Sequence, residues 1–318
     1  MKILKKISQT NDKKREIISI SITVTISILL TILGIYGLGE YGIAIFILIP
    51  FFLGFCPTIL YGYENEVTKM NCRKVAFLSL TFFMVLLLLF AIEGLICVFM
   101  ALPLALLFSW IGSLIGFEII KRKVNNGPTM IVIFIFLIPT FSFVENQFEP
   151  KLKTVRTAIT IKASREKVWE NVVEFPQLKK PSEFIFKTGI AYPINATIKG
   201  KGIGAIRYCN FTTGSFVEPI TTWDKPKRLA FDVEKQPIPM KELSIWDIDA
   251  PHLHDYFISK KGEFRLLKLK NGDTQLIGTT WYYNDIKPNF YWDLWSNYII
   301  HQIHNRVLEH IRVTSESK

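Results

Sequence analysis

The stretch IVIFIFLIPTFSFVENQFEPKLKTVRTAITI, residues 131–161, passes from an unbroken apolar run to alternating polar and apolar residues within a few positions of Glu145. Upstream, nearly everything from Ile17 onward is apolar. Downstream, the chain alternates, turns and carries charge in the manner of a water-soluble α+β domain. We therefore predict a multi-pass transmembrane region over residues 1–148 and one globular domain over residues 149–318.

The first half contains five runs of the length that a helix needs to cross a bilayer, about 20 apolar residues. The fifth run is short and carries Pro139. The run after Arg15 is too long for a cleavable signal peptide and lacks a small-residue cleavage site. The predicted spans are residues 17–37, 42–62, 75–92, 95–118 and 128–144.

The positions of the cations predict the orientation of these spans. All Lys and Arg of the first half fall in residues 2–15, 69–74 and 121–123, and the intervening turns have none. Cytoplasmic loops collect Lys and Arg, so we expect a multi-pass protein of a cell membrane, of the bacterial inner-membrane type, with a cytoplasmic N-terminus. With five spans the C-terminal domain is extracytoplasmic; without the fifth it is cytosolic.

The membrane half also contains an apparent internal repeat. The segment from Glu40 to Pro50 matches the segment from Glu93 to Pro103 at an offset of 53 residues. This predicts two duplicated helical hairpins, each with a glutamate at its outer turn. The two glutamates either form a paired polar site or face water as ordinary turn residues.

The second half predicts one helix after an edge strand, a short second helix, a series of antiparallel strands and a long terminal helix over residues 289–313. Ser164 is the expected N-cap of the first helix, and Asn271-Gly272 is a strong hairpin signal. Trp292, Trp295 and Ile299 share the apolar face of the last helix. The expected strands are residues 155–161, 196–199, 203–211, 215–223, 229–234, 262–270 and 274–283.

Three segments of this half resemble the START-like (SRPBCC) helix-grip superfamily, within it the polyketide cyclase/dehydrase and lipid-transport branch. They are VRTAITIKASREKVWENVVEFPQL (155–178), GKGIGAIRYCNF…VEPITTWDKPKRLAFDV (200–233) and the closing helix. The resemblance covers about residues 153–313. It implies a curved antiparallel sheet around the long helix and a cavity for a hydrophobic ligand between them.

Three groups of residues are candidates for a site. Segment 235–259 is too long for a hairpin turn and is either a lid or a surface excursion. Histidines in this segment and on the last helix could imitate an acid–base or metal site, but a helical wheel turns His301 outward and His304 to the flank, so we expect no metal. Charged strand residues whose side chains face the cavity through the alternation of the strand would contact the headgroup of a ligand. The candidate catalytic residues are His252, His254 and Asp255, and the candidate lid residues are Met240, Trp246 and Tyr256. The candidate cavity residues are Trp292, Trp295 and Ile299, together with the charged residues Arg207, Glu218, Asp232 and Arg265.

Charge and cysteine content narrow the function. The two halves carry net charges of +4 and +7, and the lysines are scattered, which does not favour nucleic acid. Of the four cysteines only Cys209 lies in the predicted domain, and we expect no cofactor. The leading hypothesis is a membrane-anchored protein that binds a lipid or another hydrophobic small molecule. The alternatives are an enzyme, cyclase- or hydrolase-like, acting on a membrane-derived apolar substrate, and a structural or sensory protein with a protein partner.

Overall fold

The computed structural model describes residues 2–123, 127–145, 147–244 and 246–317. Contacts within the chain divide it into two compact units. The first comprises Met1–Glu149 and Ser244–Pro251, and the second comprises Pro150–Leu243 and His252–Lys318. We describe each unit by itself, as the helical unit and the sheet unit.

Among the residues that the structure describes, the helical unit holds five helices that are long and apolar enough to cross a membrane. Each predicted span overlaps one of them, although the second span was predicted to begin two residues before Ala44 and the third to end three residues after Leu89. Pro139 does not interrupt the last of them. Insertion into a membrane and its direction stay predictions. The elements are α1 (Lys2–Ser8), α2 (Asp12–Ile32) with η1 (Leu33–Gly37), η2 (Ala44–Leu48) with α3 (Ile49–Gly62), α4 (Lys69–Leu89), α5 (Leu95–Lys121) and α6 (Gly127–Glu145).

Small residues bring α3 and α5 together. A Cβ on Gly54 of α3 would lie 1.9 Å from the carbonyl oxygen of Ser109, and one on Gly112 of α5 would lie 2.2 Å from that of Phe51. The two backbones therefore approach at van der Waals distance, a closeness that small residues at a helix–helix interface allow.

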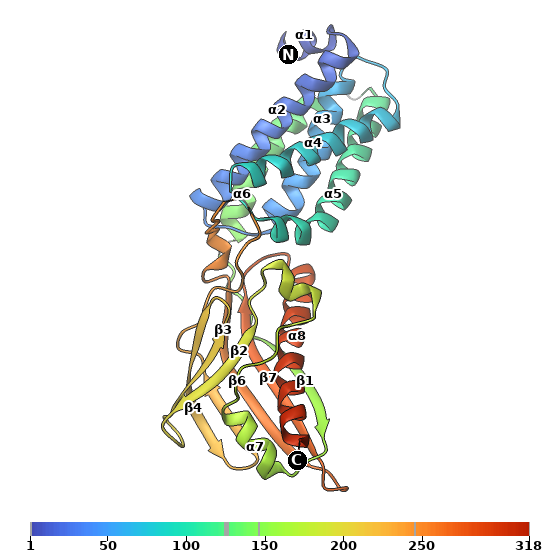
Figure 1. Cartoon of the computed structure of the whole chain (residues 1–318). Helices are drawn as coiled ribbons and strands as arrows, with labels where there is room; N and C mark the ends of the chain where they lie inside the picture. Colours follow the sequence, from blue (N-terminus) through green and yellow to red (C-terminus); the bar gives the residue numbers. More distant parts are fainter. Residues whose placement is uncertain (1, 124–126, 146, 245, 318) are drawn as a thin grey trace. The chain divides into compact units, whose positions relative to one another are not determined.

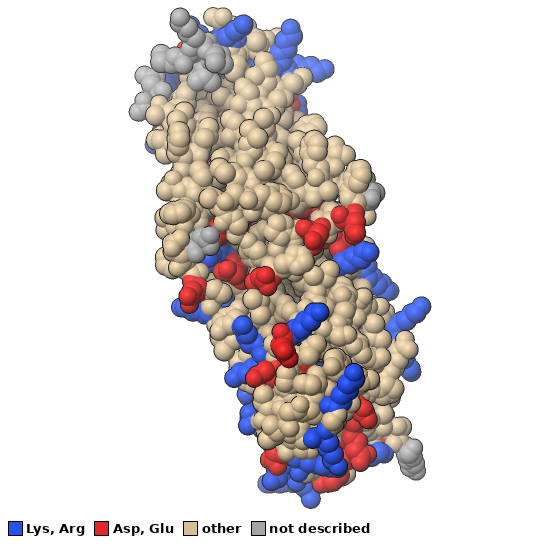
Figure 2. Space-filling view, turned by 90° about the vertical axis from the view of Figure 1, so that its left-hand side faces the viewer, with Lys and Arg blue, Asp and Glu red and all other residues tan. Residues whose placement is uncertain are grey.

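The basic segments of the helical unit gather at one end of it, and the side of a membrane on which this end lies stays a prediction. Lys74 Nζ lies 2.8 Å from the carboxylate of Glu16, and Lys69 Nζ lies 5.9 Å from the ring centre of Phe117. Figure 2 shows Lys and Arg at this end and a broad surface nearly free of charge beyond it.

The outer-turn glutamates of the proposed repeat are buried. Glu40 and Glu93 are 5% and 8% exposed, which contradicts the interpretation that both face water. The duplication itself stays a prediction.

The sheet unit is one seven-stranded antiparallel sheet in the order β1-β7-β6-β5-β4-β3-β2. Figure 1 shows the sheet curled along the long helix α8. Its elements are β1 (Lys153–Ile161), α7 (Arg165–Val173), η3 (Phe184–Thr188), β2 (Pro193–Lys199), β3 (Ile206–Phe211), β4 (Gly214–Asp224), β5 (Arg228–Asp232), η4 (Pro251–Leu253), β6 (Phe257–Lys268), β7 (Thr274–Asn284) and α8 (Asn289–Glu316).

The structure confirms the predicted order of elements and corrects some bounds. The Ser164 hydroxyl accepts from the Lys167 amide and caps α7, and Gly272 has the positive φ that the β6–β7 hairpin needs. Strand β6 begins at Phe257, inside the segment predicted as a loop, because it pairs with β7 as far as Asn284. The expected second helix is the short 3-10 segment η3.

The core of the sheet unit lies between the concave face of the sheet and the helices α7 and α8. Trp169 of α7, Leu276 of β7 and Leu308 of α8 are each at most 2% exposed and belong to one apolar cluster. Trp169 meets Trp223 edge to face at 5.6 Å between ring centres, the geometry that aromatic pairs favour. This packing holds α8 along the sheet and so sets the width of the space between them.

Candidate functional site

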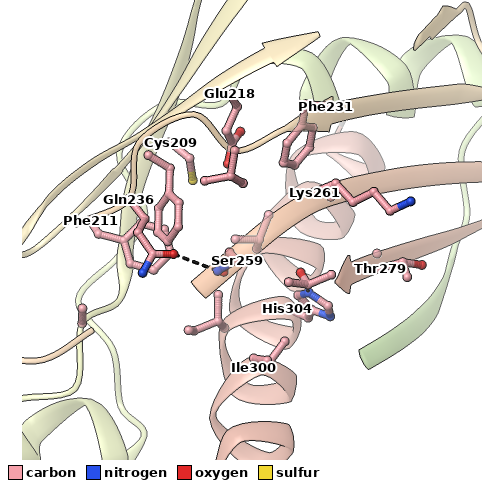
Figure 3. Close-up of a pocket in the computed structure, with 18 of the residues that line it drawn as sticks. Cys209, Phe211, Glu218, Phe231, Gln236, Ser259, Lys261, Thr279, Ile300 and His304 are labelled. Atoms are coloured by element: carbon pink, nitrogen blue, oxygen red, sulfur yellow. Dashed lines mark hydrogen bonds between the residues drawn. The ribbon is translucent and has the colours of Figure 1, made fainter. Parts of the chain in front are cut away.

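A cavity of about 150 Å³ lies between the concave face of the sheet and α8, entirely within the sheet unit. Successive strand residues point to opposite faces, and on β3 the alternate residues Arg207, Cys209 and Phe211 line this space. Most of its walls are apolar, and Figure 3 shows how residues from the strands and from α8 surround it. The principal apolar side chains are Phe211, Phe216, Phe231, Phe264, Ile299 and Ile300.

Two glycines shape this cavity wall. A Cβ on Gly262 of β6 would lie 2.4 Å from the ring of Phe231, so the ring rests directly on the backbone of β6. A Cβ on Gly278 of β7 would meet Leu308 of α8 at 3.6 Å, an ordinary contact. The Phe231 ring therefore requires a glycine at position 262. At position 278 the space would also accept a Cβ.

One ion pair is buried in the wall of the cavity. Arg207 of β3 and Glu218 of β4 stand opposite each other in the strand register, and a guanidinium nitrogen of Arg207 donates to the carboxylate of Glu218. Their side chains are 2% and 7% exposed. The Arg207 Nε also donates to the carbonyl of Val173 at 3.2 Å, and its guanidinium lies 5.5 Å from the ring centre of Phe231.

His304 of α8 faces the cavity from the other side and is held by two threonines. Its Nδ1 lies 3.0 Å from the hydroxyl of Thr157 on β1, and its Nε2 lies 2.8 Å from the hydroxyl of Thr280 on β7. The same Thr157 hydroxyl lies 2.7 Å from His301 Nδ1. One neutral imidazole donates once and accepts once, so a neutral His304 can satisfy both of its threonine partners. Burial, with a smaller effect of His301, lowers the pKa of His304 to about 4.

The structure brings some of the predicted charges to the cavity and not others. Arg207 and Glu218 face it, as alternation allowed. Asp232 is exposed, and Arg265 pairs with Glu263 at 3.1 Å on the other face of the sheet. His304 lines the cavity and His301 is half-buried beside Thr157, because β1 extends the sheet around the side of α8 on which they lie. The helical wheel did not indicate this contact of His301.

The aromatic and lid candidates lie apart from the cavity. Trp292 is buried and Trp295 is half-buried near the start of α8, and of the three helix candidates only Ile299 lines the cavity. Met240 is buried and pairs with Ile190. Trp246 is 49% exposed.

A different part of the predicted lid does border the cavity, namely residues 236–239. Gln236 fixes this segment: its side chain accepts from the Ser259 amide at 2.8 Å and donates to the Phe257 carbonyl at 2.6 Å. Tyr256 is half-buried outside the lining, where its carbonyl accepts from the Asp285 amide. The sequence indicated these four residues only through their position within the long segment 235–259.

The weak catalytic candidates are not in the lining of this cavity. His252 is buried in η4, and His254 and Asp255 are exposed just after it. Asp255 has φ of 61°. Acid–base chemistry by these residues on a molecule in the cavity therefore has no support from their placement.

No protein-family model and no curated protein matches the sequence. Solved structures resemble the chain at low identity. One is norcoclaurine synthase from Thalictrum flavum, with 14% identity over 54% of this chain and 99% of that one and a TM-score of 0.35. Another is the Aha1 dimer from Colwellia psychrerythraea, with 13% identity over 51% of this chain and 98% of that one and a TM-score of 0.29. A third is the di-domain ARO/CYC BexL from the BE-7585A biosynthetic pathway, with 8% identity over 64% of this chain and 61% of that one and a TM-score of 0.34. Values at this level assign neither a family nor an activity.

Proposed function

We propose that this protein binds a small hydrophobic molecule in the cavity between the sheet and α8, and that its apolar helices anchor the binding domain at a membrane. The observation that carries the proposal is the cavity itself, with mostly apolar walls and one fixed polar pair. Ligand sites in proteins commonly combine apolar walls with a few placed polar groups.

The size of the cavity restricts what it can hold. A dry apolar cavity of about 150 Å³ accommodates a molecule of the size of benzene, and drug-sized ligands occupy about 300 Å³ or more. A ring-sized molecule, or one such part of a larger molecule, therefore fits the space, whereas a whole phospholipid exceeds it. Anchoring keeps the cavity close to a bilayer, in which such apolar molecules concentrate.

Saturable binding of 4-fluorotoluene to the full chain in lipid nanodiscs, followed by ¹⁹F NMR, tests this proposal. Ile299→Trp places a larger side chain in the lining and is expected to abolish the saturable signal. Tyr298→Trp is the matched control, because Tyr298 lies next to it on α8, is 46% exposed and is outside the lining. Equal signals from both variants would show that the probe resides in the lipid, and the proposal would fail.

A further inference from the structure

The charges around the cavity compensate one another within the protein. The positive guanidinium of Arg207 already has a carboxylate partner in Glu218, at the directly opposed position of the neighbouring strand. A buried charge is costly unless it is paired. A ligand carboxylate would therefore have to compete with Glu218 for the same guanidinium, and an ammonium group would have to compete with Arg207.

The other charged residues along this cavity turn their side chains to the opposite face of the sheet. Lys261 places its Nζ 4.8 Å from the ring centre of Trp281, and Figure 3 shows its side chain pointing away from the cavity. The Glu263 carboxylate pairs with Arg228 at 2.7 Å on that outer face. His304 is neutral in its hydrogen-bonded chain. Among the residues that the structure describes around this cavity, none presents an uncompensated charge to it.

We infer that the occupant of the cavity is an uncharged molecule, because Arg207 and Glu218 neutralise each other and leave no free counter-charge for carboxylates or amines of the same size. The inference rests on the proposed function and narrows its ligand class. Its physical reason is that an ion loses its hydration on entering an apolar space and finds no free counter-charge there. Glu218 is thus a specificity-determining residue, because its carboxylate neutralises the Arg207 guanidinium, which would otherwise attract anions.

The test compares two probes of nearly equal size in the full chain in nanodiscs, 4-fluorotoluene and 4-fluorobenzoate. We expect the neutral probe to bind at least about ten-fold more tightly than the anion, a ratio that corresponds to about 1.4 kcal/mol. Equal or tighter binding of 4-fluorobenzoate would overturn the inference and leave the proposed function standing. Saturable binding of neither probe would refute both.

Glu218→Gln tests the role of the pair. The substitution keeps the size of the side chain and removes its charge, so Arg207 is left as an uncompensated cation, and we expect 4-fluorobenzoate to gain at least about ten-fold in affinity. Glu263→Gln is the matched control, because Glu263 is also a buried strand glutamate paired with arginine but lies on the outer face. A gain of equal size in both variants, or in neither, would overturn the assignment.

A double variant covers the case in which Glu218→Gln does not fold. Arg207→Met with Glu218→Leu removes both charges, and replacing a buried ion pair by apolar residues is often tolerated. We expect this variant still to bind 4-fluorotoluene and still not to bind 4-fluorobenzoate. If the anion binds to the double variant, the exclusion does not arise from the absence of a free counter-charge.

Discussion

Acidification should destabilise the sheet unit through His304, because unfolding allows this buried imidazole to take up a proton. The pKa of His304 is about 4 in the folded protein and about 6.5 when exposed. Between these values the unfolded state binds more protons, so stability is fully present above pH 6.5 and is lost as the pH falls towards 4. At pH 4.5 the loss from this one group is about 2 to 3 kcal/mol.

Hydrogen exchange of the full chain, read by mass spectrometry on peptides from β1 and β7, measures this loss as a change in opening free energy. His304→Asn should lack the His304 contribution and show a smaller drop between pH 7 and 4.5. His301→Asn, which removes the neighbouring ring on the same Thr157 hydroxyl, should keep the drop. If His304→Asn and the unchanged protein lose equal stability over this range, the burial argument for His304 is refuted.

Four substitutions test the packing and the α7 cap by urea unfolding or by the same exchange measurement. Gly262→Ala should cost about 1–3 kcal/mol because its methyl group meets the Phe231 ring, whereas Gly278→Ala should be close to neutral; equal costs would contradict the contact. Ser164→Ala should cost about 1 kcal/mol through loss of the α7 N-cap, and an unchanged midpoint would show that the cap contributes nothing. Trp169→Ala should cost about 3–5 kcal/mol as a buried large-to-small change, and a cost below 1 kcal/mol would mean that the α7 packing is misassigned.

Much of the fold follows from local patterns in the sequence. The five apolar runs correspond to helices α2 to α6, and period-two alternation located the strands because one face of each strand is buried. The turn at Asn271-Gly272 located the β6–β7 hairpin, because Gly272 accepts the positive φ that this turn requires. Strand ends were less certain, since pairing across the sheet, as at Phe257, decides where a strand begins.

The site was harder to predict, because its position depends on how the sheet curves around α8. A helical wheel gives the apolar face but not the level along the helix at which a cavity opens. Trp292 lies seven residues before Ile299, about 10 Å along the axis, and falls outside the lining. Likewise, the wheel turned His301 outward, and only the curl of the sheet at β1 shows why a polar Thr157–histidine contact lies there.

The pairing of β1 with β7 has a consequence for synthesis on the ribosome. Ile161 ends the first strand, and its partner Thr274 is translated more than a hundred residues later. At about 5–20 residues per second, β1 waits for roughly 6–23 seconds before its neighbour β7 begins to exist. During that interval its edge is open to other extended chains. The nascent chain therefore has a time window in which a chaperone that covers β1 would raise the yield of folded protein.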